Sequence, residues 1–377
     1  MHLYLHIPFC KQACHYCDFH FSTHLGGKTA MVDALCREIA MQRNYLKTNR
    51  LETIYFGGGT PSLLTDAELG QLFEMIHRHF TVDADAEITL EANPDDLTPA
   101  RLAGLKSFVN RLSIGIQTFH EPHLRFMNRA HSATEALQCV RLAQDAGFSN
   151  LTIDLIYGIQ NPDSSQNDHR IWQQDLEQAI GLDVPHISSY CLTIEPRTVF
   201  GHRVKKGTLQ TPDDAFGAEE FMMLVQTLTH HGYEQYEISN FARPGHEARH
   251  NSSYWKRRPY LGVGPSAHSY DGHSRHFNAA SNAQYVRAIQ RGELPCTRET
   301  LSSSDQVNEY LLTGLRTKWG CRIGDLNELM QGDFLRKQQT ELTDLTRRGW
   351  LTLTPDRLLL TEAGKLFADR VAAELFV

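Results

Sequence analysis

Residues 3–19 read LYLHIPFCKQACHYCDF, an apolar run followed at once by three closely spaced cysteines. Cys10, Cys14 and Cys17 form a CxxxCxxC motif, and this spacing is typical of metal binding. Three thiolates on one short loop can hold three irons of a 4Fe–4S cluster and leave the fourth iron open to a chelating small molecule. Three cysteines and one nearby histidine would instead make a tetrahedral zinc site, with a fourth ligand from His15, His20 or His24.

Strand and helix patterns alternate through the first half of the chain. Between the strands lie amphipathic stretches, of which Asp66–Phe80 is the clearest; it begins at a capping box of Thr65 and Glu68. Six such units predict an α/β fold, a partial (β/α)6 barrel over residues 1–200, with the cysteine loop at the carboxyl end of its first strand. The predicted strands are Leu3–Ile7, Thr53–Phe56, Glu87–Glu91, Arg111–Ile116, Leu151–Tyr157 and Ile187–Thr193.

The second half has a different character. Residues 201–301 form a predicted accessory segment, in which Ala242–Asn282 is rich in Gly, Pro, His and aromatic residues and is expected to be irregular. Residues 302–377 follow a helix–helix–strand–strand–helix pattern, which predicts a winged-helix-like C-terminal domain. This domain carries ten Lys and Arg against eleven Asp and Glu. The domain has no excess of positive charge, so we expect no nucleic-acid partner.

Composition narrows the class of protein further. The chain has 377 residues and a formal net charge of −7, which argues against a binder of polyanions. No run of apolar residues is long enough for a membrane-spanning helix, so we expect no integral membrane segment. The first residues lack the pattern of a secretory signal, which favours a cytoplasmic location. In that compartment the eight cysteines are expected to be metal ligands or buried thiols.

Five sequence blocks together resemble one family. They are YLHIPFCKQACHYCDF, IYFGGGTPSLL, EITLEANP, RLSIGIQTF and IDLIYGI, in this order. The chain resembles the radical S-adenosylmethionine (SAM) enzymes, and within them the branch of oxygen-independent coproporphyrinogen III oxidase and the HemW-type haem chaperones. The resemblance implies a 4Fe–4S cluster on the three cysteines and SAM on the open iron. It also implies an electron donor such as flavodoxin or ferredoxin, and cleavage of SAM to a 5′-deoxyadenosyl radical.

The resemblance also implies a set of SAM contacts at the carboxyl ends of the strands. The glycine run lets the backbone approach a ligand closely, and Arg129 offers a planar fork for a carboxylate of SAM or of a porphyrin propionate. Cys191 is implied as a backbone contact, and its thiol is expected to be buried. The implied SAM residues are Tyr4, Tyr16, Gly58, Gly59, Thr60, Glu91, Gln117, Arg129, Asp154 and Cys191.

Departures from the oxidase pattern point to the haem chaperones. Phe19 stands where the oxidase carries a fourth cysteine, and the first strand leaves no room for the oxidase's N-terminal arm. His250 begins HNSSYW, which matches the HNxxYW motif of the chaperones, and its imidazole is the predicted haem ligand; His268 is a weaker candidate. We therefore expect transfer of haem to an acceptor protein such as a respiratory cytochrome. The alternatives are oxidation of coproporphyrinogen III to protoporphyrinogen IX, which would make the chain an enzyme, and a zinc-stabilised binding module.

Overall fold

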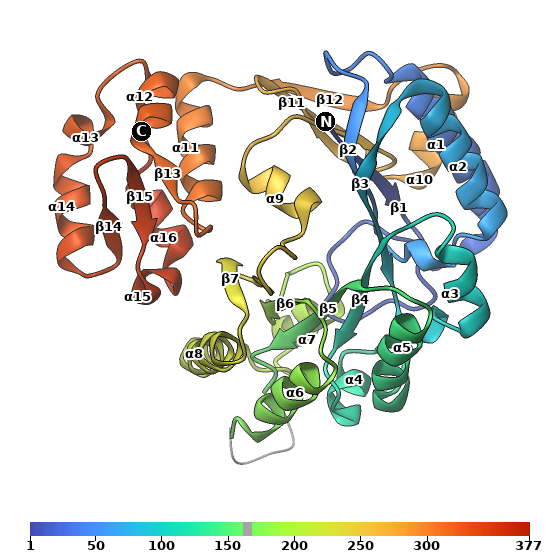
Figure 1. The fold of residues 1–377 in the computed structure, drawn as a ribbon, viewed down its shortest axis with the longest axis horizontal. Helices are drawn as coiled ribbons and strands as arrows, with labels where there is room; N and C mark the ends of the chain where they lie inside the picture. Colours follow the sequence, from blue (N-terminus) through green and yellow to red (C-terminus); the bar gives the residue numbers. More distant parts are fainter. Residues whose placement is uncertain (161–167) are drawn as a thin grey trace.

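Six parallel strands form the centre of the main sheet. The structure is a computed structural model and describes residues 1–160 and 168–377. The central strands lie side by side in chain order from β1 to β6 (Figure 1), and every strand predicted from the sequence is present. They span His2–Ile7 (β1), Arg50–Gly58 (β2), Thr81–Ala92 (β3), Arg111–Gln117 (β4), Asn150–Tyr157 (β5) and His186–Cys191 (β6).

Helices connect these strands and cover one face of the sheet (Figure 1). The second helix begins as predicted, because Thr65 Oγ1 accepts a hydrogen bond from Glu68 N at 3.2 Å and Thr65 N donates to the Glu68 carboxylate at 2.7 Å. The connecting helices are α1 (Lys28–Met41), α2 (Asp66–His79), α3 (Pro99–Leu105), α4 (Glu121–Phe126), α5 (Ala133–Asp145) and α6 (Arg170–Gly181).

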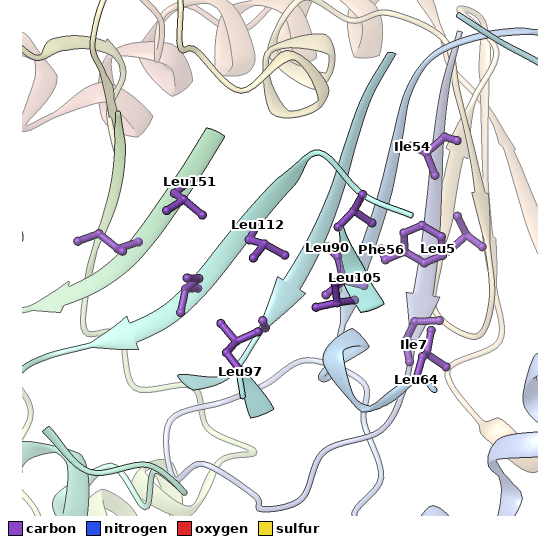
Figure 2. Close-up of a cluster of buried hydrophobic side chains, with 14 of the residues drawn as sticks. Leu5, Ile7, Ile54, Phe56, Leu64, Leu90, Leu97, Leu105, Leu112 and Leu151 are labelled. Atoms are coloured by element: carbon purple, nitrogen blue, oxygen red, sulfur yellow. The ribbon is translucent and has the colours of Figure 1, made fainter. Parts of the chain in front are cut away.

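The two faces of the central strands differ in chemistry. Leu3, Leu5 and Ile7 of β1 are buried in the hydrophobic core. Figure 2 shows Leu5 and Ile7 together with apolar residues of the neighbouring strands. Side chains alternate along a strand, so His2, Tyr4 and His6 of β1 lie on the opposite, inner face. The inner face of the sheet is therefore polar and aromatic, and it is the face that carries the candidate site.

Further strands extend both edges of the sheet. On one edge β9 (Tyr260–Val263) pairs parallel with β1 and is followed by the antiparallel strands β10 (His268–Tyr270), β11 (Ser274–Asn278) and β12 (Cys296–Thr300). On the other edge β6 pairs with β8 (Asn240–Ala242), and β8 pairs with β7 (Glu234–Glu237). The sheet runs from β12 to β7 without closing, which confirms the predicted partial barrel.

The prediction of an irregular Ala242–Asn282 was wrong. This segment holds strands β9, β10 and β11 and the helix α9 (Arg249–Trp255), which lies on the inner side of the sheet (Figure 1). Its strands have three to five residues, too few to show a periodic pattern. Their partners come from the exposed edge of β1, so the pairing is tertiary rather than local. The remaining helices of this half are α7 (Val199–Lys205), α8 (Asp214–His230) and α10 (Asn282–Gln290).

The C-terminal domain has its own hydrophobic core and a small sheet of order β13-β15-β14. It is anchored to the main sheet by the pair between Arg316 and Glu237 at 3.0 Å and by Lys318 N, which donates to Tyr236 O at 3.0 Å. No helix in the described residues is long and apolar enough to cross a membrane. The domain contains α11 (Ser303–Gly314), β13 (Cys321–Arg322), α12 (Ile323–Met330), α13 (Phe334–Lys337), α14 (Gln339–Arg347), β14 (Leu351–Leu353), β15 (Arg357–Leu360), α15 (Glu362–Lys365) and α16 (Ala368–Glu374).

Candidate functional site

The cysteine loop follows β1 and is fixed by hydrogen bonds to the turn after α4. Asn128 Nδ2 donates to Ala13 O at 2.7 Å, and Asn128 O accepts from Gln12 Nε2 at 3.0 Å. His15 N donates to Met127 O at 3.0 Å. These bonds hold both sides of the loop, so its thiols face the inner side of the sheet in a defined arrangement.

The three cysteines are half-buried free thiols. Removal from water raises the pKa of the Cys10 thiol and raises that of Cys17 to about 11, so both are protonated at neutral pH until a metal displaces the proton. Thr60 Oγ1 donates to Cys10 Sγ at 3.4 Å, and Arg129 Nη1 donates to Cys14 Sγ at 3.4 Å. Among the described residues, no three His, Cys, Asp or Glu side chains are close enough together to bind a single metal ion. A 4Fe–4S cluster does not need such a group, because each cysteine binds a different iron.

The cysteines open into a cavity of about 590 Å³, which we call the cluster cavity. Such a volume suits a small-molecule ligand. The structure thus brings together most of the residues singled out from the sequence. Tyr4 lies at a neighbouring cavity, and His250 lines neither. The predicted residues that line the cluster cavity are Cys10, Cys14, Tyr16, Cys17, Gly58, Gly59, Thr60, Glu91, Gln117, Arg129, Asp154 and Cys191.

One expectation about these residues was wrong. The Cys191 side chain is exposed rather than buried. It is the last residue of β6, and the strand ends at the rim of the cluster cavity.

Arg129 connects the cysteine loop to the strand ends. Its Nη2 donates to Gly115 O at 2.7 Å and to Asn93 Oδ1 at 2.9 Å, while its buried Nε has no partner in the described structure. Asn93 Nδ2 in turn donates to Thr60 Oγ1 at 3.2 Å. Sequence reasoning missed Asn93, although it stands in the EANP block; it closes a polar chain between Cys10 and Cys14.

Glu91 lies at the end of β3, within hydrogen-bond distance of β2. Its Oε1 accepts from Tyr55 OH at 2.8 Å, and its Oε2 accepts from Gly58 N at 3.1 Å. Removal of the carboxyl from water, with a smaller contribution from Asp154, raises the pKa of Glu91 to about 7. For the same main reason the pKa of Asp154 is raised to about 6. Two carboxyl groups in one cavity therefore titrate close to neutral pH.

The glycine run at the end of β2 is needed for the fold of the cysteine loop itself. A Cβ on Gly59 would lie 2.7 Å from Phe9 O, and a Cβ on Gly58 would lie 2.6 Å from the His6 ring. Gly58 also has a φ of 114°, which an L side chain rarely adopts. These positions let β2 end directly against the loop, so the wall of the cavity is backbone there.

Gln117 is held in an unusual conformation at the end of β4. Its φ is 70° although it is not a glycine, and the pairing of β4 with β5 shifts register there. The next two residues are fixed by Asp175 of α6, which accepts from Thr118 Oγ1 at 2.6 Å and from Phe119 N at 2.8 Å. Asp175 was not predicted; it is buried, and this desolvation raises its pKa to about 7.

His250 is buried inside the barrel rather than exposed to a ligand cavity. Its Nδ1 bonds to Thr53 Oγ1 at 2.6 Å and its Nε2 to Tyr254 OH at 2.8 Å. Its ring stacks on Tyr55, with 4.9 Å between centroids. Glu87 of β3 accepts from His250 N at 2.9 Å and so fixes the start of α9. Both ring nitrogens are engaged, and a role of His250 as haem ligand stays a prediction.

A second cavity of about 590 Å³, which we call the aromatic cavity, adjoins the first. It lies between the β9–β10 edge of the sheet and α11 of the C-terminal domain. Phe19 lines both cavities, and its side chain is 76% exposed. The other residues that line both are Asp18, Gly58 and Glu91. The two spaces therefore meet at the end of the cysteine loop.

Comparison with known proteins covers nearly the whole chain. The radical SAM superfamily profile matches residues 4–166, and the HemN C-terminal domain profile matches residues 301–367. A relative from Bacillus subtilis named heme chaperone HemW is 35% identical over 98% of this chain and 97% of its own length. Proteins of the same name from Lactococcus lactis and Escherichia coli are 33% and 34% identical, over 96% and 100% of this chain and 93% and 97% of their own lengths.

The fold also matches a solved structure. Coproporphyrinogen III oxidase (HemN) from Escherichia coli superposes with a TM-score of 0.84, at 22% identity, over 100% of this chain and 90% of that chain. At this identity the match supports the fold alone, whereas the full-length relatives support the closer grouping. The chain therefore belongs to the radical SAM superfamily and, within it, to the family of the heme chaperone HemW.

Proposed function

We propose that the chain is a haem chaperone, which binds a 4Fe–4S cluster, SAM and haem and passes haem to an acceptor protein. The observation that carries the proposal is the similarity, at about the full length of both chains, to relatives named heme chaperone HemW. The proposed compartment is the cytoplasm. In support of this, all eight cysteines are free thiols, as expected of a protein in a reducing environment.

The residues of the cluster cavity fit the cofactors that the family implies. Cys10, Cys14 and Cys17 would hold three irons of the cluster. The buried, unpartnered Nε of Arg129 and the carboxyl of Glu91 offer opposite charges to a ligand that carries both a carboxylate and an ammonium group. The proposed SAM contacts are Tyr4, Tyr16, Gly58, Gly59, Thr60, Glu91, Gln117, Arg129, Asp154 and the backbone of Cys191.

Within this site the protein's own groups position and shield the reactants. When bound, the cluster and SAM would supply one-electron radical chemistry. Arg129 ties the cysteine loop to β4 through Gly115 O and donates a hydrogen bond to Cys14 Sγ. Asp175 holds the turn after Gln117, so the end of β4 keeps its place in the wall. These contacts come from the protein's own side chains and backbone, and they fix the walls of the site.

The second candidate function is oxidation of coproporphyrinogen III propionates to vinyl groups. It is favoured by the fold shared with the E. coli oxidase and by a second cavity, of about 590 Å³, beside the cluster cavity. Phe19 argues against the oxidase function, because this position carries a fourth cysteine in the oxidase and an exposed phenyl ring in this chain.

The proposed partners follow from the proposed function. The haem acceptor is a haem protein such as a respiratory cytochrome. The cluster also needs a one-electron donor, for which we propose a flavodoxin or a ferredoxin. Helix α7 offers a route to the cluster, since Phe200 N donates to His15 O at 3.0 Å within the cysteine loop.

The decisive experiment is an anaerobic turnover assay. The chain, with its cluster reconstituted, is given SAM, reductant and coproporphyrinogen III, and a parallel sample is loaded with haem and mixed with an apo-cytochrome. We expect no protoporphyrinogen and a gain of cytochrome haem. Multiple turnovers to protoporphyrinogen would establish the oxidase instead. The Cys14→Ala variant should lose the iron and sulfide chromophore, whereas stoichiometric zinc in the unmodified chain would support the zinc-binding module.

A further inference from the structure

We infer that the aromatic cavity is the haem site and that His268, rather than His250, ligates the haem iron. This inference rests on the proposed function and assigns the cargo to a place in the fold. The cavity offers what an iron tetrapyrrole needs: an exposed imidazole, flat aromatic walls, and cationic groups for the propionates.

His268 is the most exposed imidazole of this cavity. Three histidines line it. His6 is engaged at both nitrogens, by Tyr4 OH at 3.1 Å and His20 O at 2.8 Å, and His20 Nε2 is bonded to Asn282 Oδ1 at 2.7 Å. The His268 side chain is exposed. Its ring is supported by stacking on Phe277, with 5.4 Å between centroids.

The His250 imidazole is not accessible to a haem iron. It lies in the barrel interior, and iron ligation there would break the bonds of its ring to Thr53 and Tyr254. It would also have to displace α9, whose first N–H groups are bound by the buried Glu87 carboxylate. His250 acts instead behind the cavity wall, where it fixes the hydroxyl of Tyr254, a residue that lines the aromatic cavity.

The walls of the cavity suit a flat macrocycle. Tyr254, Tyr260 and Tyr270 line it, and the rings of Tyr254 and Tyr260 meet edge to face at 4.6 Å. The opposite wall is α11 of the C-terminal domain, through Glu309 and Thr313. The volume of about 590 Å³ lies within the usual range for sites that bury a small ligand. The site is therefore complete only in the full chain.

Arg257 is the cation best placed for a propionate. It adopts a φ of 52°, unusual for a residue other than glycine, and its buried Nε has no partner within residues 1–160 and 168–377. Its Nη2 donates to Tyr270 OH at 3.0 Å, which holds the guanidinium at the cavity wall. A second arginine, Arg275, also lines the cavity but is paired with Glu309 at 2.7 Å. A carboxylate would satisfy the open donor of Arg257.

Phe19 lies where the aromatic cavity meets the cluster cavity, and we assign it to the haem contact surface. A phenyl ring that is 76% exposed is costly in water, and this one stands where the two cavities meet. A macrocycle in the aromatic cavity would cover the ring on one side. Haem would then lie beside the SAM site, with Glu91 and Gly58 exposed to both ligands.

Ferric haem titrated into the full chain with its cluster reconstituted tests the inference. Resonance Raman and magnetic circular dichroism identify the iron ligand beside the cluster absorption. We expect a histidine-ligated spectrum, and we expect His268→Ala to weaken haem binding about tenfold or more. His268→Cys should give a thiolate-ligated spectrum. His230→Ala, at an exposed position at the end of α8, is the matched control and should leave both readouts unchanged.

Metal-free protoporphyrin IX separates iron ligation from the fit of the ring. His268→Ala should bind it as the unmodified chain does, whereas Arg257→Gln should bind both tetrapyrroles more weakly. The inference is overturned if His268→Ala keeps the histidine-ligated spectrum and affinity, or if His250→Ala alone abolishes ligation in a folded protein. An unmodified chain with no specific haem spectrum would overturn the haem-chaperone function, and this inference with it.

Discussion

The backbone N–H of Gly58 donates to the Glu91 carboxylate across the ends of β2 and β3, with 3.1 Å between Gly58 N and Glu91 Oε2. This bond and that from Tyr55 OH are the protein's own partners of a carboxyl whose pKa desolvation raises to about 7. Both protonation states are therefore accessible near neutral pH. Only the ionised form attracts an ammonium group, so the charge of Glu91 links pH to ligand binding at this place.

SAM binding should accordingly depend on pH. Because folding raises the pKa of Glu91, the carboxyl keeps its proton below about pH 7, and affinity for the SAM ammonium should fall as pH falls through this value. Glu91→Gln should bind SAM about tenfold more weakly at about pH 8 and lose most of the pH dependence. Equilibrium binding to the cluster-loaded chain measures both. Glu74→Gln on α2 is the control, and a pH profile unchanged by Glu91→Gln would refute the assignment.

Arg129 should affect the reduction potential of the cluster as well as hold the cysteine loop in place. Its Nη1 donates to Cys14 Sγ at 3.4 Å, and such donors stabilise the extra negative charge of a reduced cluster. Arg129→Met should make the reduction potential more negative by on the order of 60 mV, the shift that corresponds to a tenfold change for one electron. A redox titration followed by electron paramagnetic resonance measures it. Arg141→Met, at an exposed position on α5, should have the unmodified potential.

Local sequence was sufficient to predict the central fold and the cysteine loop. The strand from Leu3, the capping box at Thr65 and the cysteine loop depend on neighbours in sequence, and the structure agrees with them. The family blocks then named residues that the structure brings into one cavity. Asn93 was overlooked within such a block, because only the fold shows that its side chain reaches both Thr60 and Arg129.

Three features of the fold depend on contacts between residues that are distant in sequence, so local sequence patterns could not predict them. The short strand Tyr260–Val263 exists because the edge of β1 offers it a partner. The HNSSYW motif predicts a haem ligand but not its burial, and His250 is buried because α9 folds onto the inner face of the sheet. Asp175 lies fifty-six residues from Phe119 in sequence and supports it through a hydrogen bond, a relation that no local pattern contains.

The two candidate haem ligands should differ in their effect on stability. His250→Ala removes two buried hydrogen bonds and leaves a cavity beside Tyr55, so it should lower the free energy of unfolding by about 3 kcal/mol. His268→Ala removes an exposed side chain and should change it by less than about 0.5 kcal/mol. Urea unfolding of the chain without haem compares them. A similar small effect of both substitutions would contradict the structural role given to His250.

Helix α7 should form the docking surface for the electron donor. Its Phe200 contacts His15, with 5.6 Å between ring centroids, and His15 lies between two cluster cysteines. The exposed end of the helix carries Lys205, followed by Lys206, on a chain whose net charge is −7. These lysines would attract an acidic donor protein to a helix whose Phe200 contacts the cysteine loop.

Reversal of this charge tests the docking surface. The double change Lys205→Glu and Lys206→Glu should slow cluster reduction by flavodoxin about tenfold at low salt, and the difference should shrink as salt screens the charges. Reduction by dithionite, which does not dock, should be unaffected. The matched control is Arg336→Glu with Lys337→Glu, also exposed basic residues at the end of a short helix, α13, in the C-terminal domain. Equal slowing by both pairs would mean that overall charge, rather than this surface, governs the encounter.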